Sequence, residues 1–234
     1  MARECLLHGG NHGSDLYRRL ELNHVDSRSC ERPRILAVLS SLLDRVVVKN
    51  ERYAASATAN GHSNLTVFHG LRAPSISIDK YLERIFKYAN CSPSCFVVAY
   101  VYIDRFIQQK PSLPVTSLNV HRLLVTSVMV AAKFLDDAYY NNAYYAKVGG
   151  VNTQEMNRLE LEFLFHLNFR LQVTVSVFES YCNRLEKEVS GSHIERPLHI
   201  QIGCGLDGGV TSATQSNAPD KQRLPTVRCS MAGL

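Results

Sequence analysis

The sequence predicts an all-α fold in which one helix is buried at the centre of a bundle. Between residues 33 and 189 the apolar residues recur with the period of an α-helix, and no strand pattern of comparable strength occurs there. The segment 120–135, VHRLLVTSVMVAAKFL, is apolar on nearly every side, which is typical of a helix enclosed by other helices. The flanking regions are polar and show no sustained apolar period.

Six helices are expected from their caps and apolar stripes. Pro33 suits the first position of the first helix, and Ser92-Pro93 opens the third. Asn152 and Glu155 have the spacing of a capping box at the start of the fifth. The expected ranges are 33–49, about 78–86, 92–109, 119–135, 152–167 and about 174–185.

Three zones organise the chain. We expect a flexible leader over residues 1–31, the helical domain over 32–189, and a low-order tail over 190–234 that is rich in Gly, Ser, Thr and Pro. The longest near-apolar stretch is far shorter than the roughly 20 residues of a membrane span, and the first residues do not resemble a signal peptide. The seven cysteines are therefore expected to be free thiols in an intracellular protein of the nucleus, the cytoplasm or both.

Motifs for a cofactor, a metal or a nucleic acid are weak. Gly203, Gly205 and Gly208 have dinucleotide-loop spacing, but no helical pattern follows them. Cys91 and Cys95 lack the second ligand pair of a zinc site. The net charge of +5 is spread along the chain and forms no basic stripe. We therefore expect no catalytic residue, no cofactor, no metal, no nucleic acid and no membrane partner.

Two charged residues border apolar faces. Lys133 lies one turn before the end of the fourth helix, and Glu160 lies among the apolar residues of the fifth. They could complement the helix dipole and line the rim of the core. They could instead anchor a partner protein, and spacing alone favours the first interpretation.

Three segments resemble the cyclin box. They are YIDRF at 102–106, AAKFLDD at 131–137 and RLELEFLFHLNF at 158–169, in the order and at the separations of that family. The resemblance covers about residues 33–189 and is greatest to plant P-type (U-type) cyclins, which are similar to fungal phosphate-pathway cyclins. It implies a single cyclin box, a five-helix bundle around a buried central helix, with an extra N-terminal helix and flexible tails.

The resemblance also implies a function. The chain would be a non-catalytic subunit that binds a cyclin-dependent kinase as a heterodimer and activates it, in cell-cycle or phosphate signalling. Lys133, Glu160 and Phe134 occupy positions where cyclins contact the kinase beside its movable helix. Asp104 and Arg105 are expected to make internal polar contacts.

Two departures from larger cyclins fit the single-box group of cyclins. The stretch matching their substrate-docking motif reads PSISI at 74–78, and the chain has no Trp, so the resemblance does not imply that groove. Too few residues follow Val189 for a second box, as expected of single-box cyclins. The alternative function is a cyclin-fold adaptor in transcription that associates with DNA or a polymerase and activates no kinase.

Overall fold

The computed structural model describes residues 11–22, 32–56, 65–110 and 113–189. Within those ranges the chain forms eight helices and no strand, so the predicted all-α class is confirmed. The helices are α2 (Asn11–Arg19), α3 (Arg34–Ser56), α4 (Ile78–Ala89), α5 (Pro93–Gln109), α6 (Val120–Leu135), α7 (Asn142–Gly149), α8 (Thr153–His166) and α9 (Val175–Val189).

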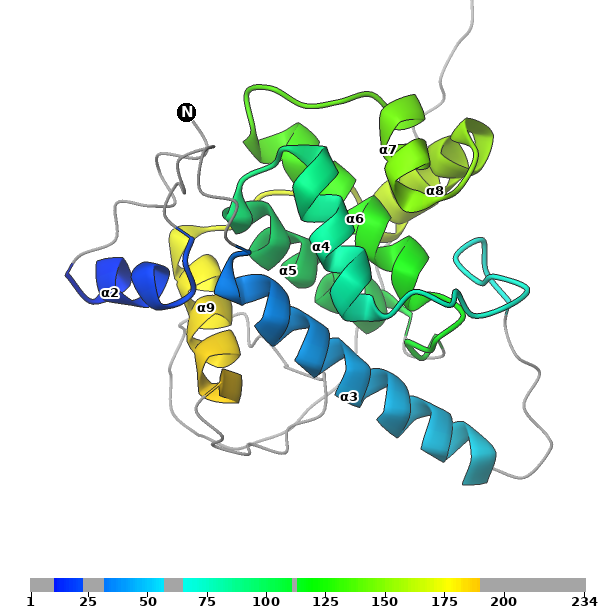
Figure 1. Ribbon diagram of the computed structural model, residues 1–234, viewed down its shortest axis with the longest axis horizontal. Coiled ribbons are helices and arrows are strands. Elements are labelled where there is room, and N and C mark those ends of the chain that lie inside the picture. The colour runs from blue at the N-terminus through cyan, green and yellow to red at the C-terminus, as the bar shows by residue number, and fades with distance from the viewer. Residues whose placement is uncertain (1–10, 23–31, 57–64, 111–112, 190–234) are drawn as a thin grey trace, which may run out of the picture. The chain divides into compact units, whose positions relative to one another are not determined.

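The core is built around α5 and α6, which pack along each other (Figure 1). α6 is buried from Val120 to Ala132 except at Arg122, as predicted for the central helix. α5 is buried almost as completely, because CFVVAYVYI places apolar side chains on every side of it. Helices α3, α8 and α9 cover α5, and α4, α7 and α8 cover α6.

The remaining predicted helices begin near their expected caps. Ser77 caps α4 by accepting a hydrogen bond from the backbone N–H of Lys80 at 3.3 Å. Asn152 caps α8 in the same way, accepting from Glu155 at 2.7 Å. The Glu155 carboxylate accepts from Arg122 Nε at 2.7 Å, which ties α8 to the first turn of α6. α3 extends to Ser56, past the predicted end at Lys49.

Helix α7 has no counterpart in the sequence prediction, because eight residues are too few to show a helical period. Asn141 caps its start by accepting from the backbone N–H of Tyr144 at 3.0 Å. Gly150 ends it with a φ of +74°, a conformation that glycine adopts without strain. Near that end, a Cβ on Gly149 would lie 3.0 Å from a Val125 methyl group, so α7 closely approaches α6 there.

The predicted leader also contains a helix, which differs from the expectation of a flexible segment over residues 1–31. Leu16 and Tyr17 on α2, with Leu20 and Leu22 just after it, are buried, and α2 packs on α9. The Tyr17 ring lies 5.8 Å from that of Phe178, and Arg19 pairs with Glu186 at 2.7 Å. The apolar stripe of α2 spans only about two turns, which is too short for a helical period to be recognised in the sequence. The expected tail over 190–234 lies outside the described residues.

Docking of α2 should contribute to the stability of the domain. Replacing Tyr17 with Ala removes a ring that is 1% exposed, and we expect it to lower the free energy of unfolding by about 3 kcal/mol. Tyr17→Phe keeps the ring and loses only a hydroxyl 3.3 Å from Glu179, so its effect should stay below about 1 kcal/mol. Denaturant unfolding of the two variants measures both. Unchanged stability in Tyr17→Ala would show that α2 does not pack on the domain in solution.

Candidate functional site

Lys133 and Glu160 form an ion pair at the contact between α6 and α8. The Lys133 Nζ lies 2.7 Å from Glu160 Oε1, and the two side chains are 25% and 19% exposed. Lys133 reaches this position because it lies in the last turn of α6, where the apolar run ends. The pair is therefore partly shielded from water but accessible from one side.

Asn142 completes the arrangement from the first turn of α7. Its Oδ1 accepts a hydrogen bond from Lys133 Nζ, and its amide donates to Glu160 Oε2 at 2.7 Å and to Asn157 Oδ1 at 2.8 Å. We call Lys133, Asn142 and Glu160 the polar triad. Sequence analysis did not identify Asn142, because its role depends on the contact of three helices and no motif marks it.

Lys133 lies in the last turn of α6, where a cation complements the helix dipole, and it also makes bonds to other helices. Lys133 donates to side chains on α7 and α8. An ammonium has three N–H donors, and these two bonds leave one available. Each Glu160 oxygen likewise makes one bond and retains further accepting capacity. The triad is thus held internally and retains unused hydrogen-bonding capacity.

Large apolar side chains are exposed on the same elements. Phe134 follows Lys133 and is 42% exposed. Leu161 and Phe165, one turn apart on α8, and Phe169 beyond its end are each more than half exposed. The rings of Phe165 and Phe169 meet edge to face with centroids 5.3 Å apart. We call Phe134, Leu161, Phe165 and Phe169 the apolar face. The sequence analysis named only Phe134 of this set.

Phe169 has an unusual backbone. Its φ is +56° and that of Asn168 is +49°, both in the left-handed region. Asn tolerates this conformation, but for an aromatic residue it is strained. The ring of this strained residue is 57% exposed where the chain turns from α8 toward α9. Strained, exposed apolar residues are frequent at binding sites.

Asp104 and Arg105 on α5 make internal polar contacts. Asp104 is fully buried, and it accepts hydrogen bonds from the Tyr181 hydroxyl and from Gln108 Nε2. Burial, reinforced by the Asp104 charge, raises the pKa of Tyr181, so this hydroxyl stays a donor. The Arg105 guanidinium donates to the carbonyl oxygens of Arg170 at 2.8 Å and Gln172 at 3.1 Å. Arg105 thereby fixes the segment that follows Phe169.

The two cysteines of the possible zinc motif lie in the core. Cys91 and Cys95 are buried free thiols, and the Cys95 thiol donates to Asp136 Oδ2 at 3.3 Å. Across the described ranges, no cluster of three or more His, Cys, Asp or Glu side chains is arranged to hold a metal ion. In that same part of the chain no helix is long and apolar enough to cross a membrane. The glycines at 203–208 lie outside the described residues.

Comparison with known proteins gives consistent matches. The family model described as Cyclin matches residues 33–171, which include the polar triad and the apolar face. Cyclin-U4-1 of Arabidopsis thaliana is 63% identical over 169 residues, covering 72% of this chain and 81% of that protein. Cyclin-P3-1 of Oryza sativa subsp. japonica is 54% identical, covering 76% of this chain and 75% of its own length. Cyclin-U1-1 of Arabidopsis thaliana is 58% identical over 157 residues.

The contacts of Arg105 lead to a prediction about its role. Arg105→Ala should lower the free energy of unfolding by about 1–2 kcal/mol, because its charged hydrogen bonds to two carbonyl oxygens are lost. Arg105→Lys should recover only part of this loss, because an ammonium can still donate to a carbonyl oxygen but lacks the planar fork of a guanidinium. Denaturant unfolding of the free protein measures both changes. Unchanged stability in Arg105→Ala would contradict an internal structural role.

Proposed function

The chain belongs to the cyclin family, whose members are regulatory subunits, and we propose that it binds and activates a cyclin-dependent serine/threonine kinase as a one-to-one heterodimer. The observation that carries this proposal is the polar triad beside the apolar face, on α6, α7 and α8. The domain over 32–189, stabilised by α2, would be the kinase-binding unit. In this proposal the protein acts in the nucleus or the cytoplasm, in cell-cycle or phosphate signalling.

The polar triad suits the recognition of a helix or loop through its main chain. The remaining Lys133 donor can reach a carbonyl oxygen, and Glu160 can accept from a backbone N–H. Such charged hydrogen bonds are stronger than neutral ones, most of all where a partner excludes water. Because Lys133, Asn142 and Glu160 already fix one another, little side-chain entropy is lost on binding.

The apolar face would supply the contact area around these polar bonds. Exposed aromatic side chains are favoured at the centre of protein interfaces, where they bury a large area with few rotatable bonds. Phe134 adjoins Lys133 in the chain, and Leu161 adjoins Glu160, so apolar and polar contacts lie next to each other. This combination favours a protein partner over a small charged ligand.

Activation would be allosteric. The kinase interconverts between inactive and active positions of its movable helix, and a cyclin that contacts only the active position shifts the population toward it. Moving such an equilibrium from 1:99 to 99:1 requires about 5.5 kcal/mol of differential binding. A few desolvated charged hydrogen bonds and aromatic contacts reach that magnitude. ATP and the phosphoryl transfer belong to the kinase.

The ion pair provides the first test of kinase binding. Lys133→Ala and Glu160→Ala should each weaken binding to the kinase by about 2–5 kcal/mol, whereas the stability of the free protein should fall by only about 1 kcal/mol. The double variant should lose less binding free energy than the sum of the two single losses, because the two residues contact each other. Calorimetric titration and thermal melts on the same proteins give both quantities.

The exposed pair Lys80–Glu83 on α4 offers matched controls, since the same charges are removed outside the site. Lys80→Ala and Glu83→Ala should leave kinase binding unchanged. Equal affinity of the wild-type protein and both triad variants would refute the interface assignment.

Phe169 gives a second test of kinase binding. Its exposed ring should strengthen binding, whereas its positive φ lowers the stability of the free protein. Phe169→Gly removes the exposed ring but relieves the positive φ, so stability should stay constant or rise while kinase binding weakens by at least about 1 kcal/mol. Phe169→Ala should bind the kinase as weakly but be less stable than Phe169→Gly by about 1 kcal/mol. Normal kinase binding in both variants would exclude Phe169 from the interface.

A further inference from the structure

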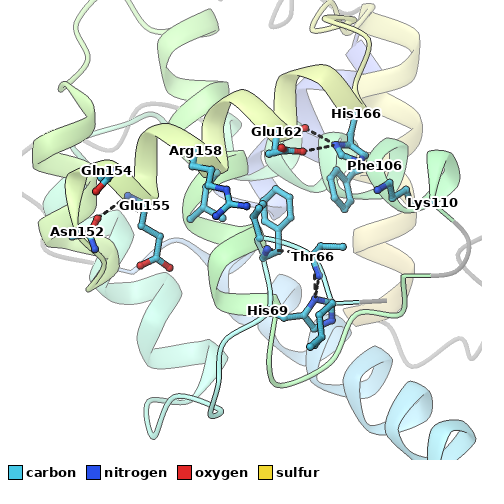
Figure 2. A pocket seen from close by; sticks show the side chains of 14 residues that line it. Thr66, His69, Phe106, Lys110, Asn152, Gln154, Glu155, Arg158, Glu162 and His166 are labelled. Carbon is cyan, nitrogen blue, oxygen red and sulfur yellow. Dashed lines mark hydrogen bonds and ion pairs between the residues drawn. The ribbon is translucent and has the colours of Figure 1, made fainter. Parts of the chain in front are cut away.

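A cleft of about 820 Å³ lies beside α8, on the face opposite Glu160. It is enclosed by residues 65–69, the C-terminal end of α5 and a stripe of α8 (Figure 2). The stripe consists of Glu155, Arg158, Leu159, Glu162 and His166, which follow the i, i+3, i+4, i+7 spacing of one helix face. A cleft of this size accommodates several side chains of a bound peptide.

The apolar part of the cleft is rigid. Phe68, Phe106 and Leu159 contribute to its lining, and all three side chains are buried. The Phe68 and Phe106 rings meet edge to face with centroids 5.0 Å apart, and Phe106 stacks on Phe163 at 5.3 Å. This buried cluster therefore forms a rigid floor, and the apolar atoms that a ligand can reach belong to Leu65, which is 73% exposed, and to the partly buried Val67.

Two cations on the cleft lack anionic partners. Arg158 points into it from α8, and Lys110 lies at the end of α5 (Figure 2). Neither side chain makes an ion pair or a hydrogen bond with any described residue; Arg158 is exposed and Lys110 is half-buried. The dipole of α5 stabilises a cation at its C-terminal end, which accounts for the position of Lys110. It does not account for Arg158, which lies in the middle of α8.

The other ionisable groups of the cleft do not balance these cations. Glu155 is already paired with Arg122 at 2.7 Å. Glu162 has only His166 nearby, at 3.9 Å. Burial lowers the pKa of His69, and its Nδ1 accepts a hydrogen bond from the Thr66 backbone, so this ring is neutral. One carboxylate thus faces two cations, and an additional acidic group would be attracted.

The cleft and the polar triad use different sides of α8. Arg158 and Glu162 each lie two residues from Glu160, which is about 200° around a helix. A ligand in the cleft would therefore leave Glu160 accessible on the opposite face of α8. We propose that the cleft binds a peptide segment of a partner protein in which an apolar side chain is followed by an acidic one.

Such a site would recruit substrates or regulators to the kinase complex. The apolar side chain would contact Leu65 and Val67, and the acidic side chain would bond to Arg158 and Lys110. Recruitment to a kinase rests on the proposed function, whereas binding of the peptide does not. The two proposals can therefore fail separately.

An array of nonapeptides tests the site on the full-length chain. Each peptide carries a central apolar residue, Leu or Phe, with Asp or Glu placed one, two or three positions later, and a matched array carries Asn or Gln instead. The wild-type chain should retain acidic members and bind the amide versions about tenfold more weakly. Arg158→Ala and Lys110→Ala should each lose about tenfold in affinity for the acidic peptides and gain no preference for amides.

Lys187→Ala is the matched control, because it removes an exposed cation from α9, outside the cleft. It should retain the acidic peptides normally, as should Glu160→Ala, which tests independence from the kinase-binding surface. Thermal melts establish that all variants are folded. Equal retention of acidic and amide peptides, or no retention by the wild-type chain at about 1 mM, would overturn the proposal. Displacement by inorganic phosphate as effective as by peptide would also overturn it, since the site would then recognise only a free anion.

Discussion

The burial of α5 and α6 is the constraint on which the rest of this structure depends. Both helices carry large apolar side chains on nearly every side, and exposing either would cost much hydrophobic free energy. Their neighbours have to cover them, and α8 contacts both. Covering α6 brings Glu160 to the last turn of that helix, where Lys133 ends the apolar run. The polar triad is thus a consequence of how the core closes.

Much of this arrangement could be predicted from sequence, because long helices leave strong local signals. The stripes of α3, α4, α8 and α9 and the cap at Asn152 depend on residues close together in the chain. The short helices α2 and α7 were missed, since eight or nine residues scarcely exceed two turns. Tyr17 was missed with α2, because its burial depends on Phe178, far along the chain.

The site itself was predictable only in part. Lys133, Glu160 and Phe134 were named through family resemblance, but nothing in their spacing indicated that Lys133 and Glu160 contact each other. Asn142 depends on three helices meeting. The exposure of Phe165 depends on which side of α8 faces the core, and that of Phe169 on the turn after α8. Such features arise from packing, so they become visible only in three dimensions. The same holds for the cleft, whose Lys110 and Arg158 belong to different helices.

The central claim is that a partner kinase binds where α6, α7 and α8 meet. Hydrogen exchange of the chain, free and bound to a cyclin-dependent kinase, tests this directly, because amides covered by a partner exchange more slowly. The account predicts that new protection is concentrated at the end of α6, the start of α7, along α8 and at residues 168–171. Protection confined to α3 and α9, with none at α6, α7 or α8, would contradict it.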